Sequence, residues 1–340
     1  MRRLLPIALL VLVALLTACG MGAPPPPPPT PTSLKPPILR TPRPTLPATA
    51  TPLPAPTARV VAQSTAAATP TPTPTPAPSV RGTPVSASEP LQGLLLDDRL
   101  LSPIIGEGFP YRVYLPPDYL QAPQRYYPVL YMLHGAGGNY TEWTDSFLPE
   151  QADRMMVAHE IPSLIIVMPD DSGQTYWANW GEGGPRWGDY LTEDVVSTID
   201  QRYRTLPNAA SRAIGGLSMG GLGALNLAFQ HPDVFGVVGA HSPSVRIDPD
   251  PTLWFLSGQT FWDNNPIWLV QHRAGLDSLK IWLDAGDEDI WLPNIEAVQA
   301  ALVEQGLNPV WHVFAGPHEA EYWIAHVPDY LRFYGASLKT

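Results

Sequence analysis

The chain of 340 residues contains a single cysteine, Cys19. No disulfide can form within one chain, so the folded part must be stable without covalent cross-links. Only 15% of the residues are charged, and the apolar run at the N-terminus, residues 4–16, is short for a membrane-spanning helix. The sequence also lacks a His-Glu-x-x-His motif, a paired-cysteine motif and a Walker lysine, so we expect neither a metal ion nor a nucleotide as cofactor.

The N-terminal segment has the features of an export signal. A basic start, Met1-Arg2-Arg3, precedes the apolar run, as is typical of a signal peptide. The run ends in Leu16-Thr17-Ala18-Cys19, which resembles the lipobox of bacterial lipoproteins, where the cysteine becomes the first mature residue and carries the lipid. We therefore predict a lipoprotein-type signal peptide over 1–19 and anchoring to the outer face of the cell membrane through Cys19. A secreted protein, cleaved near Ala18, is the alternative.

A proline-rich segment follows the signal. Of the 43 prolines in the chain, 21 lie between Pro24 and Pro84, many of them alternating with threonine. Because proline fixes φ and removes a backbone donor, we predict that residues 20–90 form a disordered, extended linker, or stalk, and no folded domain.

Charge is distributed unevenly along the chain. Residues 1–90 contain seven basic residues and one acidic residue, whereas residues 91–340 contain 13 basic and 30 acidic residues. A domain this acidic is a poor candidate for binding nucleic acid or anionic lipid through its surface, so neither is expected as its partner.

The segment 91–340 reads as one domain in which strands alternate with helices. Apolar runs predict buried strands, and helical spacing of apolar residues predicts helices, one of them beginning near Thr192 as its cap. This alternation predicts an α/β fold with a mostly parallel sheet flanked by helices. The predicted strands are 111–115, 129–133, 164–168, 212–214, 235–240, 280–283 and 310–314; the predicted helices are 150–160, 190–203, 222–231, 294–304 and 321–334.

The pentapeptide Gly216-Leu217-Ser218-Met219-Gly220 matches the Gly-x-Ser-x-Gly pattern of a nucleophile elbow, in which a serine sits on a sharp turn between a strand and a helix. A strand is predicted before it and a helix after it, as the motif requires. The glycines have a steric reason, because such a turn leaves no room for Cβ atoms two residues on either side of the serine. We predict that Ser218 is a nucleophile.

A serine nucleophile needs a base, usually a histidine that a carboxylate orients. In the α/β-hydrolase order the acid and then the histidine follow the serine. His318 lies in a loop after the last predicted strand and is the predicted base. His241, which also follows a strand, is the runner-up, with a pocket-lining or capping role as its other interpretation. Asp289 is the predicted acid, and Asp284, at the end of its strand, is the fallback.

The oxyanion of the tetrahedral intermediate needs two donors. The backbone N–H of Met219, directly after the nucleophile, is the first. The second is assigned to Ala136, in the loop His134-Gly135-Ala136-Gly137-Gly138, where His134 shapes the loop and is not the base. Candidate substrate-binding residues, with rim packing as an equally weighted alternative, are Trp143, Asn179, Trp180, Trp187 and His241.

These motifs resemble the putative-esterase branch of the α/β-hydrolases, which includes feruloyl esterases, S-formylglutathione hydrolases and the mycolyltransferase antigens. The resemblance rests on 111–117, 127–135, Trp143, 216–221 and 285–289, and it spans nearly all of 91–340. It implies an α/β-hydrolase fold and the same acid, base and oxyanion donors. Relatives often have a larger apolar residue at the position of Ala136, which implies a wider pocket here.

The leading hypothesis is a serine carboxylic-ester hydrolase outside the cytoplasm that forms an acyl-enzyme on Ser218. Its expected partners are a small-molecule or carbohydrate ester and, through Cys19, the membrane. The alternatives are an acyltransferase that passes the acyl group to a sugar or lipid, and a non-catalytic carbohydrate-binding protein on a stalk. The sequence does not specify the acyl group, the alcohol or the oligomeric state.

Overall fold

The computed structural model describes residues 83–84, 87 and 90–340. The predicted signal peptide 1–19, including Cys19, and nearly all of the predicted linker 20–90 lie outside the described residues. Within the described part, no helix combines the length and apolar character that a bilayer span requires.

The described residues form a sheet of nine strands in the order β1-β2-β3-β5-β4-β6-β7-β8-β9. The strands from β5 to β9 in this order pair in parallel, whereas β1, β2 and β3 pair antiparallel at one edge. The strands are β1 (Thr83–Pro84), β2 (Leu94–Leu101), β3 (Gly108–Leu115), β4 (Val129–Leu133), β5 (Ile165–Pro169), β6 (Arg212–Leu217), β7 (Val237–His241), β8 (Lys280–Gly286) and β9 (Val310–Phe314).

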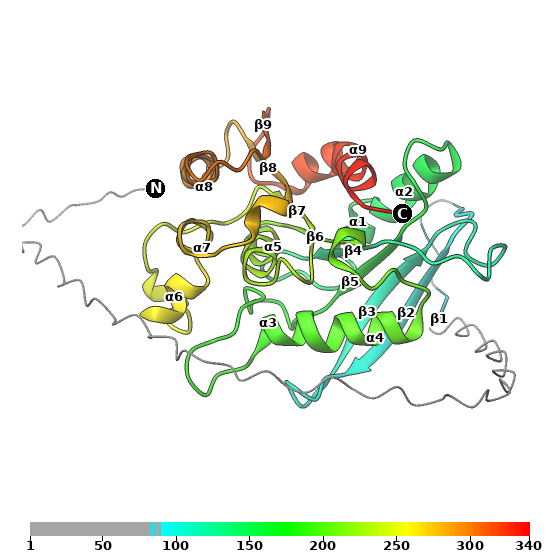
Figure 1. The fold of residues 1–340 in the computed structure, drawn as a ribbon, viewed down its shortest axis with the longest axis horizontal. Helices are drawn as coiled ribbons and strands as arrows, with labels where there is room; N and C mark the ends of the chain where they lie inside the picture. The colour runs from blue at the N-terminus through cyan, green and yellow to red at the C-terminus, as the bar shows by residue number, and fades with distance from the viewer. Residues whose placement is uncertain (1–82, 85–86, 88–89) are drawn as a thin grey trace, which may run out of the picture. The chain divides into compact units, whose positions relative to one another are not determined.

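Helices cover both faces of the sheet (Figure 1). One apolar cluster packs α1, α2 and α9 against one face, and a second cluster packs α4, α5, α7 and α8 against the other. The helices are α1 (Glu142–Asp145), α2 (Leu148–Val157), α3 (Trp187–Asp189), α4 (Val196–Arg202), α5 (Met219–Gln230), α6 (Gln259–Asp263), α7 (Pro266–His272), α8 (Leu292–Glu304) and α9 (Ala320–Ser337).

The central strands consist almost entirely of apolar residues because both of their faces are covered. Every residue of β4, β5, β6 and β7 is buried. Burial on both faces favours continuous apolar runs over alternation, which is why these strands were predictable from the sequence. The predicted α/β fold with a mostly parallel sheet is confirmed.

Several elements differ from the prediction: α1, α6, α7, β1 and β2 were not predicted, and one predicted helix begins at a different residue. The helix predicted over 190–203 begins earlier, at α3, and passes through a π-helical turn, Tyr190–Val195, before α4. Thr192 is therefore no cap: it lies inside the helical segment, and its hydroxyl donates to the Gly188 carbonyl at 3.0 Å. Strand β2 was not predicted, because its acidic centre, Asp97-Asp98, interrupts the apolar pattern.

The carboxyl ends of the parallel strands lie at one edge of the sheet, where ligands bind in open α/β sheets. The segments that follow β4, β6, β7 and β8 therefore meet there. These segments contain the predicted oxyanion loop, Ser218, Ser242 and Asp289, respectively.

Candidate active site

Ser218 occupies a strained turn between β6 and α5. Its backbone has φ 52° and ψ −116°, a conformation that L-residues seldom adopt. A Cβ added at Gly216 would lie 2.4 Å from the backbone carbon of Gly220, and one at Gly220 would lie 2.4 Å from the Leu133 carbonyl oxygen. The steric reason that we gave for the two glycines is therefore observed: neither position has room for a side chain.

The three residues predicted as a triad are brought together from three different strand ends. His318 Nε2 lies 2.9 Å from Ser218 Oγ, and His318 Nδ1 lies 2.9 Å from Oδ2 of Asp289. The carboxylate is fully buried, while about a fifth of the His318 side chain is exposed. This arrangement allows Nδ1–H to donate to Asp289 and leaves Nε2 free to accept the serine proton.

Asp289 is held by donors on both carboxylate oxygens. Its Oδ1 accepts the backbone N–H of Trp291 at 2.7 Å, and its Oδ2 faces His318 and the Ser242 hydroxyl. Burial by itself raises the pKa of Asp289, but the hydrogen bonds from His318, Ser242 and the Trp291 amide outweigh it and hold this pKa below its ordinary value. The acid is therefore ionised at neutral pH.

Ser242 is a residue of the site that sequence reasoning missed. It is fully buried at the end of β7, its φ is 49°, and its Oγ donates to Asp289 Oδ2 and lies 3.0 Å from His318 Nδ1. A serine after a predicted strand is a weak signal, and its contact with the acid depends on β7 and β8 being neighbours in the sheet.

The oxyanion loop after β4 has its amides occupied on either side of Ala136. The Gly135 N–H donates to Glu142 Oε2 at 2.6 Å, the Gly137 N–H to the Gly173 carbonyl at 2.5 Å, and the Gly138 N–H to the Gly135 carbonyl at 3.1 Å. The Ala136 amide has no acceptor in the described part of the chain, and its residue is exposed.

The other predicted donor, Met219, is the first residue of α5. The first amides of a helix have no intrahelical acceptor, so this N–H is available to a ligand. The oxyanion loop lies beside the nucleophile, because a Cβ at Gly135 would be 3.6 Å from the Ser218 Cβ. Met219 is adjacent to Ser218, and the loop that contains Ala136 lies beside it, so both predicted donors are near the nucleophile.

The interpretations of His241 as a base or a pocket-lining residue are wrong. His241 is fully buried beneath the site; its Nδ1 lies 2.9 Å from Asp284 Oδ1, and its Nε2 lies 2.9 Å from the Tyr334 hydroxyl. Burial lowers the pKa of His241, so the ring is neutral. The fallback acid Asp284 faces His241 and accepts from Trp282, Tyr322 and Tyr330, and no contact joins it to His318 in the described residues.

The predicted aromatic cleft is not assembled around the serine. Trp143 is 1% exposed and donates to the Leu133 carbonyl at 2.9 Å, so it packs beneath the oxyanion loop and cannot contact a substrate. Trp187 is 6% exposed and packs edge-on to Phe109, so it belongs to the core. A tryptophan side chain can pack in a core or line a cleft, and the sequence alone does not decide between the two. Here both tryptophans pack against apolar neighbours.

Asn179 and Trp180 lie partly exposed along a cavity of about 610 Å³. None of the residues that line this cavity belongs to the triad. The role of Asn179 and Trp180 in substrate binding stays a prediction.

Among the described residues, no group of three or more acidic, histidine or cysteine side chains is arranged to hold a metal ion.

Comparison with known proteins shows that the domain is similar to esterases. The family model described as "Putative esterase" matches residues 102–334. An esterase of Mycobacterium tuberculosis is 34% identical over 141 residues, which are 41% of this chain and 30% of that protein. An endo-1,4-beta-xylanase/feruloyl esterase of Xylanibacter ruminicola is 32% identical over 140 residues, which are 37% of this chain and 18% of that protein. The chain thus spans less than a third of the length of these relatives.

Solved structures extend the likeness over about three quarters of the chain. A ferulic acid esterase matches with a TM-score of 0.66 and 26% identity, covering 73% of this chain and 99% of that structure. An S-formylglutathione hydrolase from Agrobacterium tumefaciens matches with a TM-score of 0.64 and 19% identity, covering 75% and 99%; at this identity the likeness shows the fold alone. The fold is the α/β-hydrolase fold.

Proposed function

Since the chain belongs to the esterase family whose model covers residues 102–334, we propose that it is a serine carboxylic-ester hydrolase that forms an acyl-enzyme on Ser218. The observation that carries this proposal is the continuous chain of contacts from Ser218 through His318 to Asp289, at 2.9 Å for each step. A hydroxyl in this setting can lose its proton as it attacks a carbonyl carbon.

In the proposed reaction, Ser218 Oγ attacks the ester carbonyl while His318 Nε2 takes the hydroxyl proton. Asp289 stabilises the imidazolium through Nδ1. The tetrahedral intermediate collapses, the ester C–O bond breaks, and the departing alkoxide takes the proton from His318. Water then attacks the acyl-enzyme by the same route, which releases the carboxylic acid and restores the Ser218 hydroxyl.

Charge that develops on the carbonyl oxygen requires preorganised donors, and the amides of Ala136 and Met219 supply them in this proposal. Both groups are backbone N–H donors close to the nucleophile and have no competing acceptor among the described residues, so they need no rearrangement during the reaction. Donors of this kind are typically worth about 10²–10³-fold in kcat each.

Replacing Ser218 with alanine tests the proposed function. We expect Ser218→Ala to lower kcat for p-nitrophenyl acetate by about 10⁴-fold or more. The matched control is Ser211→Ala, which removes a buried hydroxyl just before the same strand β6, at its opposite end. Turnover that survives in Ser218→Ala, with the fold intact by circular dichroism, would contradict the proposal. If turnover depends on Ser218, a panel of acetyl, butyryl and feruloyl esters defines which acyl group the enzyme accepts.

The proposed place of action is outside the cytoplasmic membrane, to which the chain is anchored through a lipid on Cys19. The support is the N-terminal sequence, in which a basic start, an apolar run and a lipobox-like ending follow one another. In a bacterial host that processes lipoproteins, the protein should fractionate with membranes. Cys19→Ser should lose the lipid and leave the membrane fraction; equal membrane retention of both forms would contradict the anchor.

A further inference from the structure

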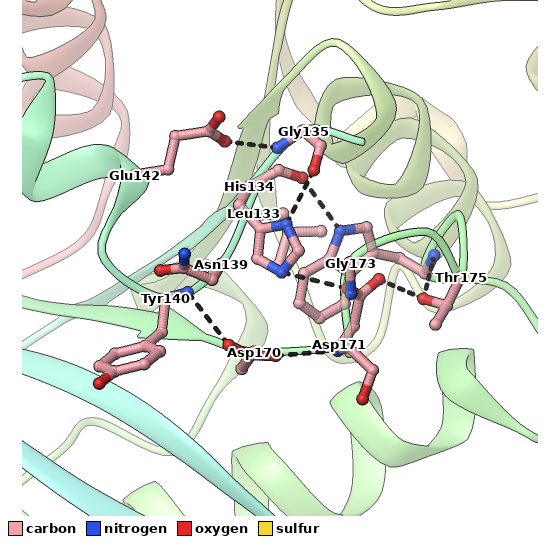
Figure 2. A network of polar contacts seen from close by, with 12 residues as sticks. Leu133, His134, Gly135, Asn139, Tyr140, Glu142, Asp170, Asp171, Gly173 and Thr175 are labelled. Atoms are coloured by element: carbon pink, nitrogen blue, oxygen red, sulfur yellow. Dashed lines mark hydrogen bonds and ion pairs between the residues drawn. The ribbon is translucent and has the colours of Figure 1, made fainter. Parts of the chain in front are cut away.

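His134 lies directly before the oxyanion loop and has no part in the proton transfers described above. Its side chain is 1% exposed. The imidazole Nδ1 lies 2.9 Å from the Gly135 carbonyl oxygen, and Nε2 lies 3.1 Å from Oδ1 of Asp171, at ion-pair distance without full hydrogen-bond alignment (Figure 2).

Both ring nitrogens therefore face oxygen acceptors. A carbonyl oxygen can only accept, so Nδ1 must carry a proton. Asp171 is fully buried and receives the Gly173 N–H at 2.7 Å and the Thr175 hydroxyl, so its carboxylate acts as an acceptor toward its neighbours. A bare Nε2 lone pair would face this carboxylate unfavourably, and the geometry favours a doubly protonated imidazolium.

The electrostatic surroundings agree with that state. Burial by itself lowers the pKa of His134, but the ion-pair contact with Asp171, together with the Gly135 carbonyl, outweighs it and raises this pKa above its ordinary value. The His134–Asp171 pair is neutral as a whole, and the positively charged imidazolium lies on the side of the oxyanion loop.

The Gly135 carbonyl is the other end of the peptide unit that carries the Ala136 N–H. A peptide group is planar, so a bond that fixes the carbonyl oxygen also fixes the direction of the N–H. The same oxygen also accepts the Gly138 N–H at 3.1 Å. Donors on a carbonyl polarise its amide and strengthen the N–H at the other end as a donor.

We propose that His134 is a positioning residue for the oxyanion hole: its Nδ1–H orients and polarises the Gly135–Ala136 peptide so that the Ala136 N–H donates to the oxyanion. This inference rests on the proposed function. The role of Asp171 is to hold the ring in place and to compensate its charge, while Glu142 takes the Gly135 amide and keeps it from competing for the same position.

Two substitutions separate this role from a structural one. The amide nitrogen of asparagine stands close to the place of Nδ1, and that of glutamine close to the place of Nε2. His134→Asn can keep the donor to the Gly135 carbonyl and lose the contact with Asp171, whereas His134→Gln does the reverse. If His134 served only to pair with Asp171, glutamine would be the better replacement.

The readout is the inhibition constant of a trifluoromethyl ketone, which forms a hemiketal with Ser218 whose oxygen occupies the oxyanion hole. For the purified full chain we expect His134→Asn to stay within about 3-fold of wild type and His134→Gln to bind the ketone about 10–100-fold more weakly, with kcat for p-nitrophenyl acetate falling in parallel. Equal losses, or a larger loss in His134→Asn, would overturn the inference.

A measurement on wild-type protein covers the case in which a variant does not fold. Nitrogen-15 spectra of the histidine rings at pH 7 should show protons on both nitrogens of His134; a ring with no proton on Nδ1 would overturn the inference. Absence of ester turnover in wild type would instead contradict the proposed function, and the ring spectra would still decide the state of His134.

Discussion

Three buried aspartates of the described domain each face a histidine, and the second ring nitrogen decides what each pair can do. In His318 it faces the Ser218 hydroxyl, which makes the ring a base. In His241 it faces the Tyr334 hydroxyl, deep in the core. In His134 the nitrogen opposite the aspartate faces a backbone carbonyl. The three pairs share the same residue types, and their chemistry follows from what the other nitrogen meets.

The two acidic candidates at the end of β8 give a direct comparison. Asp289→Asn should lower kcat by about 10³–10⁴-fold with little change in stability, because an amide no longer stabilises the imidazolium or its tautomer. Asp284→Asn should chiefly lower the melting temperature, because Asp284 accepts from three buried aromatic donors and faces His241. Kinetics with p-nitrophenyl acetate and thermal melts check both; loss of activity in a well-folded Asp284→Asn alone would show that the acid is wrongly assigned.

Ser242 should matter for rate through its hydroxyl and for stability through its backbone. We expect Ser242→Ala and Ser242→Gly to lower kcat about 5- to 30-fold alike, corresponding to about 1–2 kcal/mol, because both lose the donor to Asp289. The glycine variant should melt at the higher temperature of the two, since glycine tolerates a φ of 49°. Wild-type kcat in both variants would show that this hydroxyl does not support the acid.

At the scale of the element, the turn between β6 and α5 depends on the absence of side chains. Gly220→Ala should cost about 3 kcal/mol or more of unfolding free energy, because its Cβ would meet backbone atoms of Leu133 and His134 that cannot move aside. The control is Gly306→Ala, where φ is 78° but no atom lies within 4 Å, so only the backbone strain of about 1 kcal/mol is expected. Urea unfolding measures both; a cost at Gly220 no larger than at Gly306 would contradict the steric account.

The order of elements and several site residues were predictable from the sequence for local reasons. The central strands appear as apolar runs, and the elbow is marked by glycines whose need is steric. Asp289 and His318 could be nominated because each follows a predicted strand at the carboxyl edge of the sheet. Their mutual contact, at 2.9 Å, required the structure.

What the sequence could not supply depends on contacts between distant segments. Ser242 meets Asp289 because β7 pairs with β8, and the register that places His241 opposite Asp284 also buries both of them. Trp143 and Trp187 are equally suited to a cleft or a core, and only the packing of their neighbours decides. The function of an aspartate–histidine pair can therefore be assigned only once the order of the strands is known.

At the scale of the whole molecule, two buried histidines should give stability opposite dependences on pH. The pKa of folded His134 is raised, so its contribution is complete below about pH 6.5, the unfolded value, and is lost as the pH rises through the folded pKa. The pKa of folded His241 is lowered, so its contribution is complete above about pH 6.5 and is lost as the pH falls.

Urea unfolding between pH 5 and pH 9 separates the two contributions. The difference in unfolding free energy between wild type and His134→Asn should shrink as the pH rises above about 6.5. The difference between wild type and His241→Asn should grow as the pH rises from 5 toward 6.5. Differences that do not change with pH, or that change in the opposite sense, would contradict the two protonation states.

The central claim is that Ser218 carries the acyl group. The most direct measurement is intact-mass and peptide mass spectrometry of the protein quenched in acid during turnover of a slowly deacylated ester such as a p-nitrophenyl carboxylate with a bulky acyl group. The account predicts one added acyl group, on the peptide containing Ser218, in wild type and none in Ser218→Ala. An acyl group on another residue, or rapid turnover in Ser218→Ala, would contradict it.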